Sequence, residues 1–587
     1  MKTKGKMVGR KDSRADQGRW NKGRWDKDGM DRDLPHGRFA SLAGPWALIF
    51  SLLAVTFPVF DVDLYWHLAN GRAMRLLGGI VNEEVLSFTH PGVPFVNHEW
   101  LAQWMFFGLW DRWGWAGLMG LKLLLVALVV ALLFRTARLE GAAPWNAALV
   151  TCVAVMAGFF RFHVRPELFS LAGLALLQFL LLRHRRRPTG SLLWSLPVLF
   201  LVWDWLHGAA IGWLYLAGFA LFMNVRRFYP GKNRETPCSR ALLKTLNPAG
   251  LATVAVSLIN PYGLRSYGHF WTLATGAHGA DRILELQPVW RNPGDHLLLL
   301  LVLILVVLKL VFRPRHQEGV LSFLAAIFVV AAIRYLRFAE MSLIVLVPFV
   351  AQLMSGRPQP SRRGLRRDRV GLALAGVWLV LGLVFLQEKV LAARGTVSAG
   401  GTYVLPSQTA WGWGTNDFLI PRGTADFVRR HGLAGEYYNN ANLGGYLAFA
   451  LGPERKIFQF NMPPIFGDVT AMMNNPAAFA SYGLDLGFAG DPGEFRQLFS
   501  QEDWACVYND YVSSLMVRRV PRFQGIIQRY EVRHFLPEMT AGTLEQLARD
   551  PAVRKRLVFE MTVYLECMPD ERVREILDRI VARYPGG

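Results

Sequence analysis

Two aspartates separated by one residue, Asp61 and Asp63, follow the first long apolar run of the chain. A carboxylate in this position can take a proton from an acceptor hydroxyl, and a pair can hold a divalent cation through oxygen ligands. The alternative is that the pair caps an amphipathic helix expected over 64–77, because aspartate is a favoured N-cap residue. The pair is the predicted catalytic group, and Mg²⁺ or Mn²⁺ bound to it is the only candidate cofactor.

Further ionisable residues stand at the ends of other apolar runs. Guanidinium groups suit phosphate because they donate two parallel hydrogen bonds, although Arg161 and Arg165 could instead pair with the two aspartates. Glu99 has the alternative role of stabilising a helix N-terminus. The predicted substrate-binding residues are His67, His98, Glu99, Arg161, Arg165, Asp204, His207, Arg334 and Arg337.

Two of these residues, Asp204 and His207, are three positions apart, so one helical turn would place both on the same face. A metal-binding pair is one interpretation of this spacing. The tryptophans and tyrosines nearby would suit sugar rings, whose C–H faces stack on aromatic side chains.

The elements that must position these residues are membrane helices. The chain has 587 residues, of which 52% are hydrophobic and 19% are charged, and its mean hydropathy is +0.22. Apolar runs long enough for membrane helices recur up to residue 388 and then stop. Eleven spans are predicted, near 39–60, 114–134, 143–160, 168–183, 190–204, 210–225, 244–260, 295–312, 319–333, 339–355 and 370–388, and 99–112 is a candidate re-entrant or interfacial helix.

The net charge is +21, and the positions of the basic residues indicate membrane topology rather than a surface that binds nucleic acid. With a cytoplasmic N-terminus, the inner segments carry 32 Lys and Arg and the outer loops carry 10. This predicts a multi-pass protein of the bacterial cytoplasmic membrane, with its acids at the outer end. The predicted organisation is a disordered basic cytoplasmic tail over 1–38, a membrane domain over 39–390 with a long outer loop over 61–113, a linker over 391–420, and a periplasmic α/β domain with a helical end over 421–587.

Within the C-terminal region, helices are expected near 425–430 and 444–447, and strands near 435–439, 456–460, 504–509 and 514–517. Cys506 and Cys567 would both lie in the periplasm, where a disulfide is chemically allowed. The sequence leaves open whether they pair.

The order D-x-D-x-Y-W-H-L from Asp61, H-E-W-L-x-Q from His98, R-P-E from Arg165, W-D-W-x-H-G from Trp203 and N-P-Y-G from Asn260 resembles the GT-C membrane glycosyltransferases, over roughly 39–390. More closely, it is similar to little-characterised bacterial membrane proteins with a GT-C-like core. The resemblance implies that Asp61 or Asp63 is the catalytic or metal-binding acid. It also makes Arg165, Arg334 and Arg337 candidates for the phosphate of a lipid.

The C-terminal region has no counterpart of the W-W-D-type acceptor motif of oligosaccharyltransferases, so peptide glycosylation is not supported. The predicted function is transfer of a sugar from a polyprenyl-phosphate donor to a glycan, lipid or protein acceptor at the periplasmic face, with membrane lipids but no nucleic acid as further partners. The alternatives are a non-catalytic scaffold for envelope assembly and a transporter or flippase for a lipid-linked glycan. Charges gathered at one end of the bundle count against transport, which needs ionisable groups near the membrane midplane.

Overall fold

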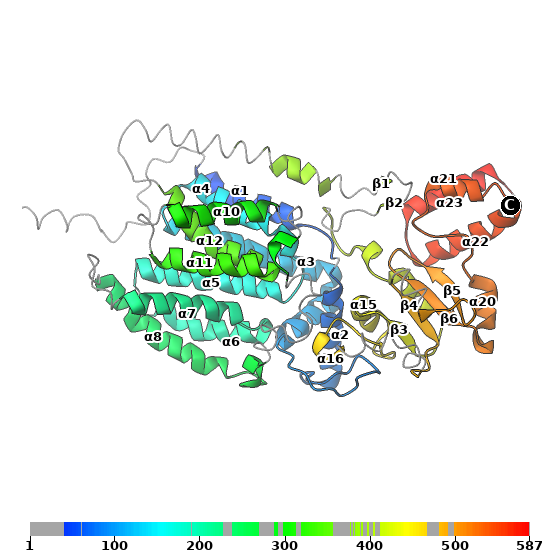
Figure 1. The fold of residues 1–587 in the computed structure, drawn as a ribbon, viewed down its shortest axis with the longest axis horizontal. Helices are drawn as coiled ribbons and strands as arrows, with labels where there is room; N and C mark the ends of the chain where they lie inside the picture. The colour runs from blue at the N-terminus through cyan, green and yellow to red at the C-terminus, as the bar shows by residue number, and fades with distance from the viewer. Residues whose placement is uncertain are drawn as a thin grey trace, which may run out of the picture.

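The computed structural model describes residues 40–59, 61–188, 191–226, 237–268, 287–291, 297–312, 319–355, 411–466, 481–490 and 498–585, with short pieces between 376 and 404. The tail over 1–38, most of the predicted span 370–388 and much of the predicted linker lie outside these residues. A helical domain and a C-terminal α/β domain of residues 411–585 stand side by side, with one helix, α2 (Val62–Leu77), between them (Figure 1).

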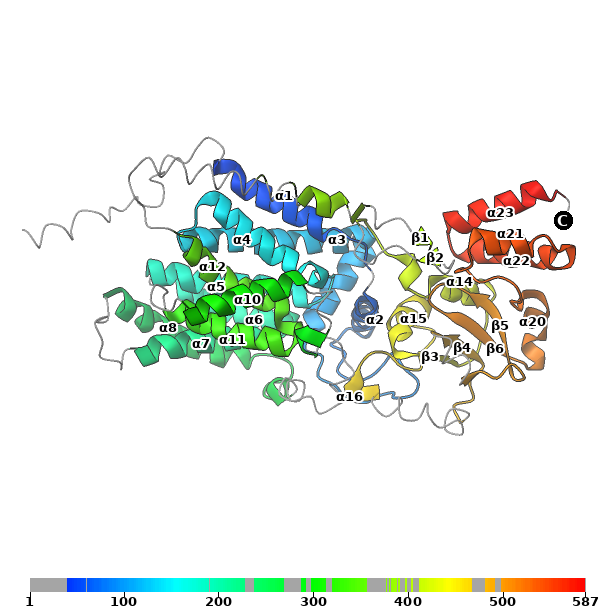
Figure 2. The same cartoon turned by 45° about the horizontal axis from the view of Figure 1, so that its top comes forward.

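The helices of the helical domain run alongside one another in both views (Figures 1 and 2). They are α1 (Ala43–Val55), α3 (Trp100–Leu139), α4 (Pro144–Ala157), α5 (Glu167–Arg186), α6 (Leu196–Leu206), α7 (Ala210–Val225), α8 (Pro237–Ser257), α10 (Leu297–Phe312), α11 (Gly319–Arg334) and α12 (Ala339–Met354). Each of the ten spans predicted before residue 356 overlaps one of these helices. By length and composition, three described segments could cross a membrane: Trp100–Leu139, Glu167–Arg186 and Leu336–Met354. The structure thus supports a membrane protein, while the count of eleven spans stays a prediction.

Helix α3 joins two segments that the sequence treats separately, the candidate interfacial helix 99–112 and the span 114–134. The two halves meet at a kink at Gly114, whose φ of 56° and ψ of −143° are not helical. Glycine adopts such a positive φ without the steric cost that a Cβ would bring. The first half of α3 can therefore take a direction different from that of the membrane helix that follows.

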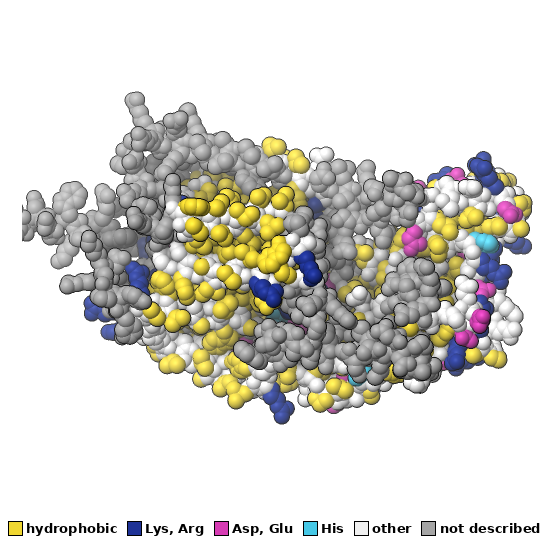
Figure 3. Space-filling view, viewed as in Figure 1, with side chains coloured by type: hydrophobic (Ala, Val, Ile, Leu, Met, Phe, Trp, Pro, Cys, Tyr) yellow, Lys and Arg dark blue, Asp and Glu magenta, His cyan; other side chains and the backbone are white. Residues whose placement is uncertain are grey.

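The surface of the helical domain is apolar. Figure 3 shows hydrophobic side chains covering it over α10 and α11, whereas acidic and basic side chains gather on the C-terminal domain. On α10, Leu301, Leu305 and Phe312 are 48%, 66% and 73% exposed. An exposed apolar face of this extent is typical of a surface covered by lipid.

Helix α2 (Val62–Leu77) lies between α3 and α15 (Ala441–Leu451) and contacts both closely. A Cβ on Gly71 would collide with the backbone oxygen of Gln103 in α3. A Cβ on Gly445 of α15 would lie 2.8 Å from the Val62 oxygen. Glycine is thus required at both contacts, and α2 is fixed between the two domains.

The C-terminal domain contains a sheet in the order β3-β4-β6-β5, in which β3 and β4 are parallel and the other pairs are antiparallel. Its elements are β3 (Tyr437–Asn439), β4 (Leu486–Ala489), β5 (Trp504–Asn509), β6 (Ser514–Arg518), α14 (Arg422–Arg430), α16 (Pro463–Phe466), α20 (Gln524–Tyr530), α21 (Ala541–Leu547), α22 (Pro551–Cys567) and α23 (Glu571–Arg583). The expected helices and three of the expected strands are present. Strand β4 was not expected from the sequence.

The strand predicted over 456–460 is wrong. Ile457 forms a single bridge with Ser87 in the segment between α2 and α3, and its amide donates to the Leu86 carbonyl at 3.0 Å. The amide of Phe458 donates instead to the Asn439 side chain at 2.9 Å. The backbone of this segment is therefore satisfied by a loop and a side chain, and it does not join the sheet.

The described residues form two hydrophobic cores. One core fills the helical domain, and the other combines α2, the first half of α3 and the C-terminal domain. Much of the segment 61–113 thus packs with the C-terminal domain. Cys506 and Cys567 both pack in the second core, and both are free thiols. The Cys506 thiol donates to the Asn509 side chain at 3.0 Å.

Candidate functional site

The two predicted catalytic aspartates hold one arginine between them. Arg165, in the segment before α5, lies with its Nη2 2.8 Å from Asp61 Oδ1 and 2.9 Å from Asp63 Oδ2, and its Nε also donates to Asp61. Asp61 is the N-cap of α2, and its Oδ1 accepts from the Asp63 amide at 3.0 Å. Both structural alternatives, the helix cap and the ion pair, are therefore present.

Asp61 is ionised in this arrangement. Burial alone would raise the pKa of its carboxyl, but the Arg165 guanidinium outweighs that effect and holds the pKa below its ordinary value. The side chain of Asp61 is 3% exposed, compared with 22% for Asp63 and Arg165. The pair thus presents a buried carboxylate whose charge is compensated by a cation of the chain itself.

The predicted divalent cation does not fit this arrangement of side chains. Arg165 occupies the position between the two carboxylates. Within the described ranges there is no group of three or more His, Cys, Asp or Glu side chains placed to hold a metal ion, and this includes Asp204 and His207. A cation at Asp61 and Asp63 stays a prediction.

A second cluster surrounds Glu99, which stands at the N-cap of α3 without making a capping hydrogen bond. Its carboxylate oxygens lie 3.7 Å from His67 Nδ1, 3.7 Å from His98 Nε2 and 3.4 Å from His207 Nε2. The Glu99 side chain is only 12% exposed. Residues from α2, from the segment before α3 and from the end of α6 thus converge on one acid.

Burial controls the charge state of this cluster. It raises the pKa of Glu99 to about 8, against the opposing charge of Arg337, and it lowers the pKa of His207 to about 3. The pKa of His67 is also held well below its usual value by burial. At neutral pH, Glu99 is therefore mostly protonated and His67 and His207 are uncharged. A carboxyl group titrating near pH 8 is well matched to accept a proton at neutral pH.

Two hydrogen-bond networks fix the orientation of these imidazoles. Ser170 Oγ lies 2.7 Å from His207 Nδ1 and accepts from Trp203 Nε1 at 2.8 Å, so His207 directs Nε2 toward Glu99. Gln103 Nε2 lies 3.5 Å from His67 Nδ1, and the Asn97 side chain donates to Gln103 Oε1 at 2.9 Å. The site is thus held by partners on several helices.

The remaining predicted arginines have separate environments. Arg161 is buried, with its Nη2 2.8 Å from Glu167 Oε2 and its Nε 3.5 Å from Glu340 Oε1. Arg337, half-buried in the short turn before α12, is close enough for its charge to act on Glu99. Arg334 is exposed and lies over the Tyr335 ring, so it does not join the cluster.

Asp204 and His207 do not act as the predicted pair. Helix α6 ends at Leu206, and His207 adopts a φ of −158°, which takes its side chain away from the helical direction. Asp204 Oδ1 accepts from the Ala209 amide at 2.8 Å and its side chain lines a cavity. The two residues therefore serve different parts of the site.

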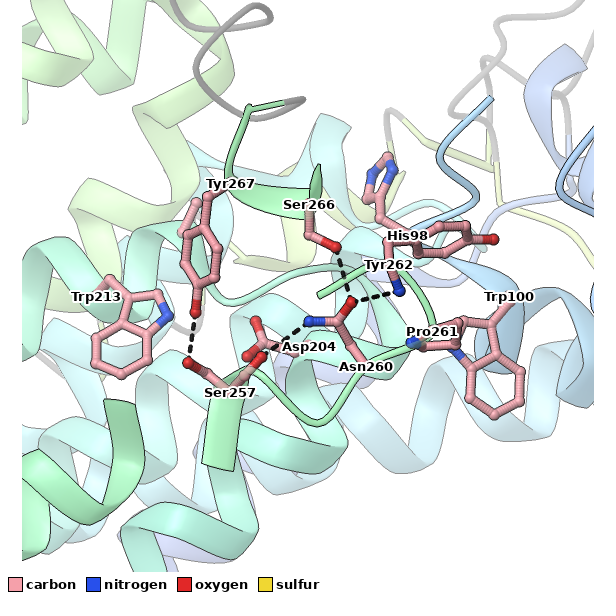
Figure 4. A pocket seen from close by; sticks show the side chains of 11 residues that line it. His98, Trp100, Asp204, Trp213, Ser257, Asn260, Pro261, Tyr262, Ser266 and Tyr267 are labelled. Carbon is pink, nitrogen blue, oxygen red and sulfur yellow. Dashed lines mark hydrogen bonds between the residues drawn. The ribbon is translucent and has the colours of Figure 1, made fainter. Parts of the chain in front are cut away.

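That cavity has a volume of about 240 Å³ and lies at the ends of α6, α7 and α8 (Figure 4). One wall is the turn of the N-P-Y-G motif. Asn260 Oδ1 accepts from the Tyr262 amide at 2.8 Å and from Ser266 Oγ at 3.0 Å, and Gly263 adopts a φ of 53°. The motif thus builds a rigid, aromatic wall.

Buried polar atoms in the wall of this cavity have no partner among the described residues. They include Trp100 Nε1, Trp213 Nε1 and Asp204 Oδ2. A buried donor or acceptor without a partner is costly, and a bound ligand would satisfy it. Two donors and one acceptor beside aromatic rings are suited to a ligand with several hydroxyl groups.

A larger cavity of about 640 Å³ lies on the other side of His98. Both cavities are lined by His98, Pro261 and Tyr262, and Glu99 lines the larger one. Met462 and Ile465 of the C-terminal domain complete its wall. The two cavities thus share His98, the residue next to the buried Glu99.

Several residues of the site were not among the sequence candidates, namely Asn97, Gln103, His163, Ser170, Trp203 and Glu340. Glu340 had a usable signal, because an acid in an apolar run is seldom retained without a role. His163, which lies close enough to Asp61 for their charges to interact, also had one, since it stands between Arg161 and Arg165. Gln103, Ser170 and Trp203 contact residues more than thirty positions away, which no local pattern reveals, and Asn97 acts through Gln103.

No family model and no curated protein sequence matches the chain. It is similar in structure to an oligosaccharyltransferase of Archaeoglobus fulgidus in its apo form, with a TM-score of 0.46 and 10% identity over 77% of this chain and 70% of that one. It is also similar to the same enzyme tethered through a disulfide bond to an acceptor peptide with an NVT sequon, with the same TM-score and identity over 83% and 75% of the two chains.

Proposed function

We propose that this protein is a membrane glycosyltransferase that moves a sugar from a polyprenyl-phosphate donor to an acceptor at the outer, periplasmic face of a bacterial cytoplasmic membrane. The observation that carries the proposal is the aromatic cavity with unpartnered buried polar atoms, which meets a buried acid at His98. The resemblance of the sequence motifs to those of the GT-C membrane glycosyltransferases also supports sugar transfer.

The donor sugar would occupy the cavity of about 240 Å³. Its C–H faces would stack on the rings of Trp100 and Trp213, and its hydroxyl groups would satisfy the two indole N–H groups and Asp204. Next to this cavity, Leu251 and Val254 of α8 and Leu258, the residue after the helix, are 72%, 51% and 44% exposed. A polyprenyl chain could lie along that apolar surface while its sugar enters from the side of the membrane.

The acceptor would occupy the cavity of about 640 Å³, against Glu99 and His98. In the transfer step, the acceptor hydroxyl gives its proton to the Glu99 carboxylate, and its oxygen forms a bond to the anomeric carbon. The bond from that carbon to the donor phosphate breaks, and the lipid phosphate leaves with the electron pair. Arg337 and Arg165 would stabilise the charge that develops on the leaving phosphate.

In this scheme, Asp61 and Asp63 hold Arg165 in position and do not take the proton themselves. The sequence-based alternative is that one of the two aspartates is the base. Of the two, Asp63 is the better candidate because it is the more exposed. Both schemes predict a transferase, and they differ in which conservative variant loses turnover.

The test is transfer of a radiolabelled sugar from defined polyprenyl-phosphate sugars by the full chain in nanodiscs. We expect Glu99→Gln to abolish turnover, while the exposed Glu454→Gln serves as the matched control. Retained turnover in Glu99→Gln with loss in Asp63→Asn would move the base to the aspartate pair. Absence of turnover with every donor would favour the scaffold, and movement of intact donor across the bilayer would favour the flippase.

A further inference from the structure

A third cavity lies outside the site described above. It has a volume of about 380 Å³ and is lined by α2, by α3 on both sides of the Gly114 kink and by the C-terminal domain. This volume lies within the range of about 300–1,000 Å³ that is typical of small-molecule sites. Its aromatic lining consists of Trp110 and Trp115 on both sides of the Gly114 kink, with Tyr446 and Phe449 from α15.

Helix α2 separates this cavity from the Glu99 cluster. Tyr65 and Arg72 are seven residues apart, which places them on one face of the helix, and both line the third cavity. Trp66 lines the larger cavity of the candidate site, and His67 faces Glu99. A molecule in the third cavity is thus on the opposite side of α2 from the proposed transfer chemistry.

The buried hydroxyl of Tyr65 indicates that the third cavity binds a ligand. The side chain is 0% exposed, and its oxygen has no hydrogen-bond partner in the part of the chain that the structure describes. Its ring is fixed by edge contacts, with centroid distances of 4.9 Å to Tyr446 and 5.8 Å to Trp115. The phenol therefore cannot rotate away to water, and a ligand oxygen in the cavity would satisfy it.

Charged groups of both signs stand beside the aromatic rings. Arg422 pairs with Asp417, which also accepts from Thr415 Oγ1 at 2.7 Å, and the three residues line the cavity. Arg72 lies 5.6 Å above the Phe449 ring and donates to the backbone oxygens of Ala448 and Phe449 at 2.8 and 3.0 Å. The wall thus offers one carboxylate, that of Asp417, and guanidinium donors held in fixed orientations.

This combination of groups suits a saccharide. Sugar C–H faces stack on aromatic rings, and neighbouring hydroxyl groups bridge a carboxylate and a guanidinium. We propose that the third cavity is a saccharide-binding site separate from the Glu99 cluster, holding a sugar unit of a glycan on the far side of α2. The proposal concerns binding and does not require that the proposed transfer reaction be correct.

The test is saturation-transfer NMR of the full chain in nanodiscs with a panel of neutral and uronate-containing oligosaccharides. Tyr65→Phe removes only the hydroxyl, and we expect about tenfold weaker binding, the effect of losing one buried hydrogen bond. Arg422→Gln should weaken binding similarly. Tyr215→Phe is the matched control, because Tyr215 is also fully buried with an unpartnered hydroxyl among the described residues, but lies in the helical core.

Three outcomes would overturn the proposal: no saccharide binds, Tyr65→Phe binds as the parent protein does, or native mass spectrometry finds a phospholipid that Tyr65→Phe releases. Glu99→Gln separates this proposal from the proposed function. If both are correct, that variant loses transfer and keeps saccharide binding. Binding without any transfer by the parent protein would support the site while refuting the enzyme.

Discussion

The charge state of Glu99 should set the pH dependence of transfer. The carboxylate is the form that accepts a proton, and burial raises the pKa of this group to about 8. About 1% of Glu99 is then ionised at pH 6, about 10% at pH 7 and about half at pH 8. The value of kcat/KM should therefore rise about tenfold per pH unit below pH 7 and level off above pH 9.

The measurement is the initial rate of sugar transfer at low acceptor concentration across this pH range, with the protein in nanodiscs. Glu99→Gln should lose both the activity and the inflection, whereas Glu454→Gln should reproduce the parent profile. A flat profile between pH 6 and pH 9 would refute the assignment of Glu99 as the base. A profile with the same inflection in Glu99→Gln would refute it as well, because another group would then be titrating.

Three further perturbations test the architecture of the site. Because the pKa of Glu99 is raised, its contribution to stability is fully present below its ordinary pKa of 4.5 and is lost as the pH rises through about 8. The melting temperature of the parent protein should therefore fall over this window, whereas that of Glu99→Gln should not. Arg165→Ala leaves the buried Asp61 carboxylate without this ion pair and should lower the free energy of unfolding by about 3–5 kcal/mol. Adding Asp61→Asn to the same chain should recover most of that loss, and equal stability of the single and double variants would contradict the ion-pair argument. Gly445→Ala places a methyl group 2.8 Å from the Val62 oxygen and should cost about 1–3 kcal/mol, measured as faster proteolysis between the domains, whereas an unchanged rate would show that α2 and α15 can separate without loss.

Local signals predicted the elements that carry the site. The apolar runs located the helices, and the aspartate after the first run predicted the start of α2 within two residues, because a helix cap is a local feature. The ion pair between Arg165 and Asp61 was foreseen only as an alternative. Which loop ends meet depends on how the helices pack, and no spacing in the sequence encodes it.

The convergence on Glu99 shows this limit most clearly. His207 lies more than a hundred residues further along the chain than Glu99. Its spacing from Asp204 predicted that these two residues form a pair, because a continued helix would place both on one face. The helix ends at Leu206, so the spacing no longer applies. The pKa of Glu99 could not be inferred either, since it depends on burial by several helices.

The glycine contacts on both sides of α2 also determine how the chain can be divided. Residues 61–113 and 411–585 share one hydrophobic core although the rest of the helical domain separates them in sequence. Removing the C-terminal domain at the linker would strip one face of α2 and leave its apolar side chains in water. A chimera between homologous chains should therefore transplant the two segments together, as one discontinuous module.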